Sequence, residues 1–231
     1  MPADPAVTGR AVRRHVGVLL PWANVAVEEE LPQLGEPGVV FHYARLVPAS
    51  RTTAVDDSFW HGLRAAATGA VDSMRHLPLD ATVLACTSAG FTGGPELPPG
   101  VITAFDALTT TLHQRHVASV ALATPYPEQV AQTEAEALAA HGIEVTGNAS
   151  LGLDDGYPHI TTAQILTLCD GLPPAALAEA DALVLSCTGW RTLTAAAALQ
   201  ARLRIPVISS NLALALALAT HTHSPAPGAA P

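Results

Sequence analysis

The sequence contains no lysine, and its 11 basic residues are all arginines. Without a lysine amine, the chain cannot use a lysine Schiff base with a substrate or with pyridoxal phosphate, and it has no P-loop lysine. Acidic residues outnumber basic ones and give a formal net charge of −9, with no run of basic residues. This charge pattern argues against nucleic-acid binding and against a polybasic membrane anchor.

Long apolar runs and paired cysteines are missing as well. No apolar run reaches the about 18 residues of a membrane-spanning helix, and no secretory signal pattern opens the sequence, so we expect a soluble, cytoplasmic protein. The three cysteines, Cys86, Cys169 and Cys187, are an odd and sparse set, which argues against a disulfide framework, and none shows the C-x-x-C spacing of a zinc site or a redox motif. His221 and His223, near the end of the chain, are too few to predict a metal site.

Apolar segments alternate with helix-like stretches along the 231 residues, which suffice for one large domain or two small ones. Short β-branched runs predict strands at 16–21, 39–46, 81–86, 117–125, 143–151, 182–187 and 204–210. Apolar residues at helical spacing predict helices at 25–34, 58–77, 101–115, 127–142, 161–172 and 211–220. Asp57 or Ser58 is expected to cap the second of these helices, and a loop rich in glycine and proline is expected after Cys86.

The order of segments repeats. Val16 lies 70 residues before Cys86, and Val117 lies 70 residues before Cys187. This repeat predicts an internal duplication and two pseudo-symmetric, Rossmann-like α/β domains with mainly parallel sheets. In such sheets, ligands bind at the carboxyl ends of the strands, where both cysteines lie. We therefore expect the two thiols to face one interdomain active-site cleft.

Each of these two cysteines is followed by small residues that can donate hydrogen bonds. Thr87 and Ser88 follow Cys86, and Thr188 and Gly189 follow Cys187. Exposed backbone N–H groups at a strand-to-helix junction lower a thiol pKa, so we expect a depressed pKa for at least one of the two thiols. The same donors suit a carboxylate or an enediolate.

The alternative interpretation is that a cysteine at the end of a buried strand is a small apolar residue. Its double occurrence, each time before hydroxyl or glycine residues, favours a functional pair. Cys169 lies on the apolar face of an expected helix and is predicted to belong to the core.

Other side chains follow the expected strands at the same edge. Asn24 could hold a substrate carboxylate or cap a helix, and Tyr126 could bind a carboxylate or pack on the next helix. Possible anion partners and cleft-flanking aromatic residues are Arg45, Arg191, Trp22 and Trp190.

Six motifs in this order resemble the maleate cis–trans isomerase and arylmalonate decarboxylase branch of the Asp/Glu racemase superfamily. They are PWANVAVEEELP, FHYARL, ACTSAGF, ATPYPEQV, HGIEV and LVLSCTGW. The resemblance covers roughly residues 15 to 218 and implies two α/β domains around a cleft, no cofactor and a homodimer. It also implies that the last strand and helix return to the first domain, giving domains of 1–97 plus 207–231 and of 98–206.

The resemblance also implies roles for single residues. Asn24 and Tyr126 match residues that contact a substrate carboxylate in maleate isomerases. Cys86 matches the cysteine that adds to the double bond as a thiolate, and Cys187 matches the partner that donates and recovers a proton. From the decarboxylase side, Thr87, Ser88, Tyr126, Thr188 and Gly189 match the pocket that holds an enediolate.

Two features separate the possible activities. Decarboxylases of this type have glycine where this chain has Cys86, so the resemblance favours isomerisation or racemisation. Gly156, however, replaces a second carboxylate-binding asparagine of maleate isomerases. The leading hypothesis is a cofactor-independent, metal-free, two-cysteine isomerase of a small carboxylic acid that acts like a maleate cis–trans isomerase, by thiolate addition to the double bond, rotation and elimination. The alternatives are a two-base racemase, a decarboxylase of substituted malonates and a non-catalytic protein that binds a small acid.

Overall fold

Short segments rich in Val, Leu, Ile and Ala form two parallel sheets, each of four strands. The structure, a computed structural model, describes residues 13–49 and 54–220. The first sheet has the order β2-β1-β3-β4 and the second has the equivalent order β6-β5-β7-β8, which confirms the duplication of the α/β unit. The strands are β1 Arg14–Pro21, β2 Val39–Leu46, β3 Ala81–Leu84, β4 Val101–Thr103, β5 Ser119–Thr124, β6 Glu144–Ser150, β7 Ala182–Leu185 and β8 Val207–Ser209.

The register of the central strands is equivalent in both halves. Leu19 of β1 pairs with Leu84 of β3, and Ala123 of β5 pairs with Leu185 of β7. Each of the two cysteine loops begins just after the last of these pairs. The duplication therefore places Cys86 and Cys187 at the same point of two equivalent sheets.

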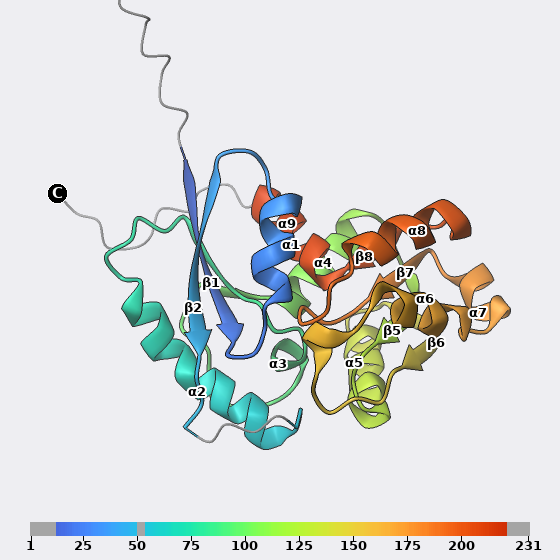
Figure 1. Ribbon diagram of the computed structural model, residues 1–231, viewed down its shortest axis with the longest axis horizontal. Helices are drawn as coiled ribbons and strands as arrows, with labels where there is room; N and C mark the ends of the chain where they lie inside the picture. Colours follow the sequence, from blue (N-terminus) through green and yellow to red (C-terminus); the bar gives the residue numbers. More distant parts are fainter. Residues whose placement is uncertain (1–12, 50–53, 221–231) are drawn as a thin grey trace, which may run out of the picture.

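Helices cover both sheets, and the two halves lie side by side (Figure 1). The helices are α1 Ala26–Leu34, α2 Asp57–Ser73, α3 Ser88–Phe91, α4 Ala104–Gln114, α5 Glu128–Ala140, α6 Thr162–Asp170, α7 Pro174–Glu179, α8 Leu193–Leu203 and α9 Ser210–Thr220. A short 3₁₀ turn spans Tyr157–His159. Within the described residues, no helix is both long enough and apolar enough to cross a bilayer.

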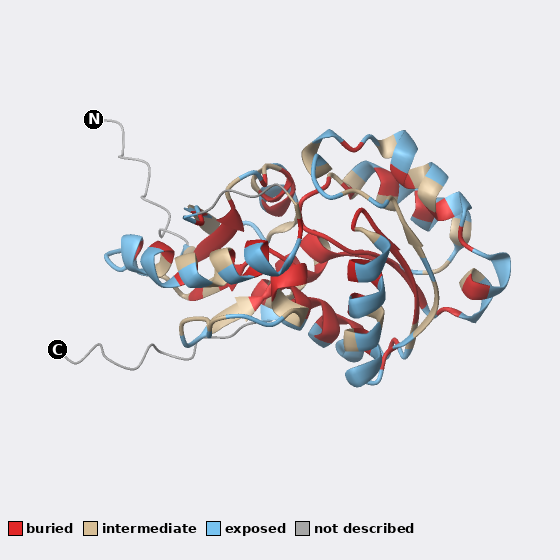
Figure 2. Ribbon diagram, turned by 90° about the horizontal axis from the view of Figure 1, so that it is seen from below, coloured by how far each residue is buried: buried red, intermediate tan, exposed pale blue. Residues whose placement is uncertain are grey.

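The two helices α4 and α9 join the halves. Ala107 of α4 and Leu214 of α9 pack with the core of the first sheet, whereas Leu108 of α4 and Ala213 of α9 pack with that of the second. Figure 2 shows the buried strands in red and the exposed outer faces of the helices in pale blue. The alternating Leu/Ala segment at 211–220 is helical, as predicted, and it is largely buried because it packs between these layers.

Some local expectations were wrong. Residues 101–103 form β4 instead of the start of a helix, because they pair with β3. The cap of α2 is Asp56, whose side chain accepts a hydrogen bond from the Phe59 backbone N–H. The expected loop after Cys86 contains α3, and α7 and α8 were not predicted.

The expected division into domains of 1–97 plus 207–231 and of 98–206 stays a prediction. By strand pairing alone, β4 belongs to the first sheet and β8 to the second. If the domains are divided by sheet, the two domain boundaries fall after β4 and after β8 instead of after residues 97 and 206. Residues 1–12 and 221–231, including His221 and His223, lie outside the described residues.

Candidate active site

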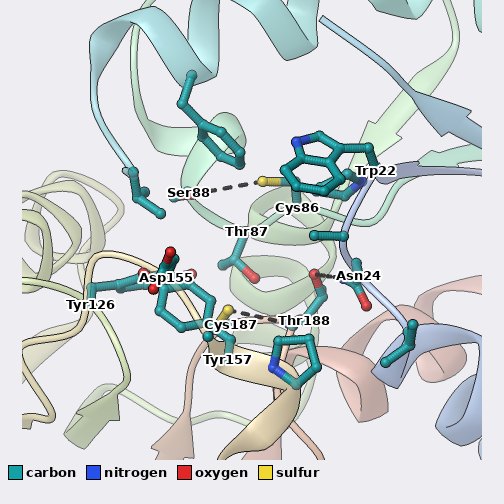
Figure 3. Close-up of a pocket in the computed structure, with 18 of the residues that line it drawn as sticks. Trp22, Asn24, Cys86, Thr87, Ser88, Tyr126, Asp155, Tyr157, Cys187 and Thr188 are labelled. Carbon is teal, nitrogen blue, oxygen red and sulfur yellow. Dashed lines mark hydrogen bonds between the residues drawn. The ribbon is translucent and has the colours of Figure 1, made fainter. Parts of the chain in front are cut away.

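Cys86 and Cys187 line one cavity of about 670 Å³ (Figure 3). Each cysteine lies two residues beyond its strand, β3 or β7, where the backbone leaves the sheet. Both are 6% exposed, and Figure 3 shows them on opposite sides of the space with Thr87 between them. One small substrate could thus meet a thiol on either side.

The eight residues predicted as catalytic or substrate-binding all line this cavity, although their roles stay predictions. They come from the loops after β1, β3, β5 and β7, which meet because the carboxyl ends of parallel strands share an edge. The residues are Asn24, Cys86, Thr87, Ser88, Tyr126, Cys187, Thr188 and Gly189.

The Cys86 thiol is surrounded by hydrogen-bond donors from α3. Burial raises the pKa of this thiol, while the Ala89 backbone N–H and the hydroxyl and N–H of Ser88 act in the opposite direction. The Ser88 Oγ lies 3.7 Å from the Cys86 Sγ and accepts a hydrogen bond from the Trp60 indole at 3.0 Å. The start of α3 therefore favours the thiolate, but less strongly than burial opposes it.

The Cys187 thiol has fewer donors and an unusual backbone. Its φ is +112°, which is rare for a residue with a side chain. Burial raises the pKa of Cys187 to about 12, although the Gly189 N–H, 3.2 Å from its Sγ, and the Tyr126 hydroxyl favour the thiolate. Its immediate surroundings therefore favour the protonated thiol.

The expectation of a depressed thiol pKa was wrong. Both thiols are buried beneath the cavity surface, and desolvation of the charged form outweighs the local donors. A thiolate at Cys86 raises the pKa of Cys187 further, because the two charges repel each other. This repulsion favours a state with one thiolate and one thiol, which is the combination that an acid–base pair requires.

Two hydroxyls that line the cavity are held by hydrogen bonds to the scaffold. The Thr188 hydroxyl donates to the Ala85 carbonyl at 2.8 Å and accepts from the Asn24 amide at 3.1 Å. The Thr87 hydroxyl donates to the Ser210 Oγ at 3.0 Å. These contacts connect residues of both halves, so the polar side chains fix the loops relative to each other.

Tyr126 has an uncommitted hydroxyl. The side chain is 1% exposed, and its Oη makes no regular hydrogen bond. Burial raises the Tyr126 pKa well above its usual range, so the group stays a neutral donor. The Cys187 thiol lies within reach of this hydroxyl, and a buried donor beside the cavity that makes no regular hydrogen bond suits a carboxylate oxygen of a ligand.

The turn after β6 forms a wall of the cavity: Gly156, which the family resemblance aligned with a carboxylate-binding position, lines it, and so does Tyr157, which the sequence did not identify. Tyr157 stacks edge-on against Tyr126, with ring centroids 5.9 Å apart, and its hydroxyl donates to the Leu153 carbonyl at 3.0 Å. Gly156 permits this turn through its φ of +76°. The available signal was the run DDGYP at residues 154–158, a turn sequence that begins three residues after the end of a predicted strand.

The two candidate arginines are already paired. Arg191 lines the cavity, but it forms a salt bridge with Glu29 and donates to the Pro158 carbonyl. Arg45 bonds to Glu28 and to the Trp22 and Asn24 carbonyls. Neither is available as a free cation for a substrate carboxylate.

Trp22 lines the cavity as predicted, whereas Trp190 does not flank a cleft: it is 0% exposed and belongs to the core. Cys169 is also a core residue, as predicted. Across residues 13–49 and 54–220, no three His, Cys, Asp or Glu side chains are grouped so that they could hold a metal ion.

A family model of arylmalonate decarboxylases matches residues 89–229, more than half of the chain. The chain belongs to the arylmalonate decarboxylase family. Arylmalonate decarboxylase from Bordetella bronchiseptica is 36% identical over 107 residues, which are 46% of this chain and 44% of that relative. The aligned segment thus spans less than half of the relative's length.

Solved structures of related enzymes share the fold of this chain. Nocardia farcinica maleate cis–trans isomerase superposes with a TM-score of 0.81 at 24% identity, over 90% of this chain and 92% of that one. That structure is a cysteine-to-serine variant with a covalently bound succinylcysteine intermediate. A glycine-to-cysteine variant of arylmalonate decarboxylase gives a TM-score of 0.72 at 25% identity, over 93% and 97% of the two chains. The predicted fold and the predicted superfamily are confirmed, and the chain is an enzyme of this superfamily.

Proposed function

We propose that this enzyme is a cofactor-independent, metal-independent isomerase that converts a small cis-unsaturated carboxylic acid into its trans isomer. The observation that carries the proposal is the presence of two thiols, on equivalent loops, at opposite sides of one cavity. A maleate isomerase of the same fold carries a covalent succinylcysteine, which makes thiol addition a chemistry compatible with this architecture.

In the proposed reaction, the Cys86 thiolate adds to one carbon of a double bond conjugated with a carboxylate. The π electrons move to the neighbouring carbon, which takes a proton from the Cys187 thiol. The bond between the two carbons is now single and rotates. The Cys187 thiolate then removes the proton, the double bond forms again, and the Cys86–carbon bond breaks. Both thiols return to their starting states, so the cycle consumes no co-reactant.

The assignment of the nucleophile follows from the donors. Ser88 and Ala89 stabilise negative charge at Cys86, whereas Cys187 has the raised pKa of about 12 that suits a proton donor. The carboxylate of the substrate is expected to bind the Tyr126 hydroxyl and the backbone N–H groups around Thr87 and Thr188, where it delocalises the charge of the intermediate.

Decarboxylation of a substituted malonate is the second candidate, and the family match favours it. That reaction needs one proton donor on one face of the enediolate. Cys187 would supply the proton, and Cys86 would have no chemical step. The two candidates thus differ in whether Cys86 is required.

The test is a proton-NMR screen in D₂O with maleate, substituted maleates, aspartate, glutamate and arylmalonates. The proposal predicts cis-to-trans conversion, which survives dialysis against EDTA and needs no added nucleotide. Loss of CO₂ from an arylmalonate would support the decarboxylase instead. Exchange of an α-hydrogen with inversion would indicate a two-base racemase, and binding without turnover would indicate a binding protein. Cys169→Ser is the matched cysteine control, because Cys169 lies in the core away from the cavity lining.

A further inference from the structure

Ser210, the first residue of α9, connects the two cysteine loops. Its side chain is fully buried. The Ser210 Oγ accepts one hydrogen bond from the Cys187 backbone N–H at 3.1 Å and another from the Thr87 hydroxyl at 3.0 Å. Thr87 directly follows Cys86, so a single hydroxyl group is shared by loops from the two halves of the molecule.

The backbone that Ser210 holds is strained. Cys187 has a φ of +112°, and a residue with a side chain keeps such a conformation only when its surroundings enforce it. The hydrogen bond from the Cys187 N–H to Ser210 is a direct constraint on this peptide group. The neighbouring Asn211 adds a second constraint, since its amide donates to the Thr188 carbonyl at 3.4 Å and to Glu30 at 2.8 Å.

The strained conformation affects the thiol. It places the Cys187 Sγ 3.2 Å from the Gly189 N–H, which favours the thiolate. Relaxation of Cys187 to negative φ would turn the side chain away from this donor. The geometry of the Cys187 loop therefore determines how readily its thiol gives up and recovers a proton.

We propose that Ser210 is a positioning residue for the two-thiol reaction. Its hydroxyl holds Cys187 in the strained conformation and, through Thr87, fixes the Cys187 loop against the Cys86 loop. This inference rests on the proposed function for its catalytic meaning, but the geometry that it concerns can be measured without any substrate.

Ser209 provides a matched control. It is the adjacent serine at the end of β8, it is 2% exposed, and its Oγ accepts a hydrogen bond at 3.1 Å from the Leu212 N–H in the first turn of α9. Ser209→Ala thus removes a buried hydroxyl at the start of the same helix without changing a contact to either cysteine loop. Ser210→Thr keeps the hydroxyl and serves as the conservative rescue.

The experiment measures alkylation of each cysteine by iodoacetamide across the alkaline range, with mass mapping of the labelled peptides. Ser210→Ala is expected to slow labelling of Cys187 by about tenfold and to move its pH midpoint upward, because the released Cys187 backbone relaxes and its Sγ leaves the Gly189 N–H donor. Ser209→Ala should change this rate by less than about twofold, since losing a helix cap does not alter the thiol's donors. Ser210→Thr should restore the rate. With a substrate from the NMR screen, Ser210→Ala should lower kcat more than it changes KM.

Equal Cys187 labelling in Ser210→Ala and Ser209→Ala would overturn the proposal, as would faster labelling in Ser210→Ala. Labelling of the core residue Cys169 reports general unfolding in the same sample. If Ser210→Ala does not fold, hydrogen exchange of the Cys187 amide in the unmodified protein decides: slow exchange supports the proposal, and exchange as fast as in exposed loops contradicts it. An absence of turnover in every variant would count against the proposed function only.

Discussion

Two glutamates at equivalent positions show how the halves of this enzyme differ. Glu30 and Glu134 each lie nine residues after a proline, Pro21 or Pro125, near the end of the first strand of their half. Both are buried, at 3% and 0% exposure. The Glu30 carboxylate accepts hydrogen bonds from the Thr192 N–H and hydroxyl, the Leu193 N–H and the Asn211 amide.

Glu134 has far fewer partners. Its Oε1 accepts from the Ser186 hydroxyl, while its Oε2 makes no hydrogen bond. Burial raises the pKa of Glu134 to about 8, against the lowering effect of Ser186. The duplicated plan therefore preserves the position of a buried carboxyl group, while the contacts around it have become different.

The two thiols are unequal as well: Cys187 has fewer hydrogen-bond donors than Cys86, as Glu134 has fewer than Glu30. Cys86 has ordinary backbone geometry and several donors from α3, whereas Cys187 has a strained backbone and lies next to Ser186, the partner of Glu134. Equivalent strands thus carry unequal chemical environments. This inequality is the basis for assigning addition to Cys86 and proton transfer to Cys187.

The largest expected effect follows from removing the proposed nucleophile. Cys86→Ser should reduce turnover by at least about 10³-fold, because a hydroxyl near neutral pH is a far weaker nucleophile than a thiolate. Steady-state kinetics with the substrate from the NMR screen measures this loss, with Cys169→Ser as the control. If Cys86→Ser still decarboxylates an arylmalonate, Cys86 is not the required nucleophile, and the decarboxylase is favoured.

Glu30→Gln tests the connection between the halves. The substitution places an amide donor near the Asn211 amide and the Thr192 hydroxyl, so we expect a loss of about 2–4 kcal/mol in the free energy of unfolding. Glu29→Gln is the control on the same helix, because it removes only the exposed ion pair with Arg191 and should cost about 0–1 kcal/mol. Denaturant unfolding compares the two variants, and equal losses would contradict the role given to Glu30.

Titration of the thiols tests their inequality directly. Both should ionise above the ordinary thiol value of about 8.5, since burial raises each pKa. Cys86 should ionise at the lower pH, because more donors surround its thiol. Iodoacetamide rates at each cysteine, followed against pH, give both midpoints. A Cys187 midpoint below that of Cys86 would reverse the proposed roles.

Glu134→Gln should change the pH dependence of stability. Below about pH 4.5 the carboxyl is protonated in the folded and unfolded chains; between about 4.5 and 8 mainly the unfolded chain releases the proton. The stability that Glu134 contributes is therefore lost as pH rises through this window, whereas Gln cannot ionise.

The quantity to compare is the Tm of the wild type minus the Tm of Glu134→Gln. We expect this difference to fall by at least about 2–4 °C between about pH 4.5 and about pH 8, which corresponds to at least about 1 kcal/mol. Thermal unfolding of both proteins across this range measures the difference. A constant difference in Tm would contradict the buried, protonated state of Glu134.

Much of the architecture could be predicted from the sequence, because local patterns determine it. The apolar runs predicted the central strands, and the equal spacing from Val16 to Cys86 and from Val117 to Cys187 predicted the duplication. Strand ends at one edge then brought the predicted cavity residues together.

The remaining features depend on contacts between distant segments. Ser210 reaches Thr87 and Cys187 only after α9 packs between the halves, and Tyr157 reaches the cavity only through the turn at Gly156. The direction of the thiol pKa shifts depends on burial, which no local motif reveals. The prediction that Trp190 flanks the cleft was wrong for the same reason, because packing in the core determines where this side chain lies.

The central claim, that Cys86 bonds to the substrate while Cys187 moves a proton, is tested most directly by intact-protein mass spectrometry of Cys187→Ala incubated with the substrate. Without Cys187, addition to Cys86 can proceed with a proton from solvent, but removal of that proton is slow. The account predicts a species with the mass of enzyme plus substrate, located by peptide mapping on Cys86. Exchange of the α-hydrogen for deuterium without any such adduct would contradict it and indicate a racemase.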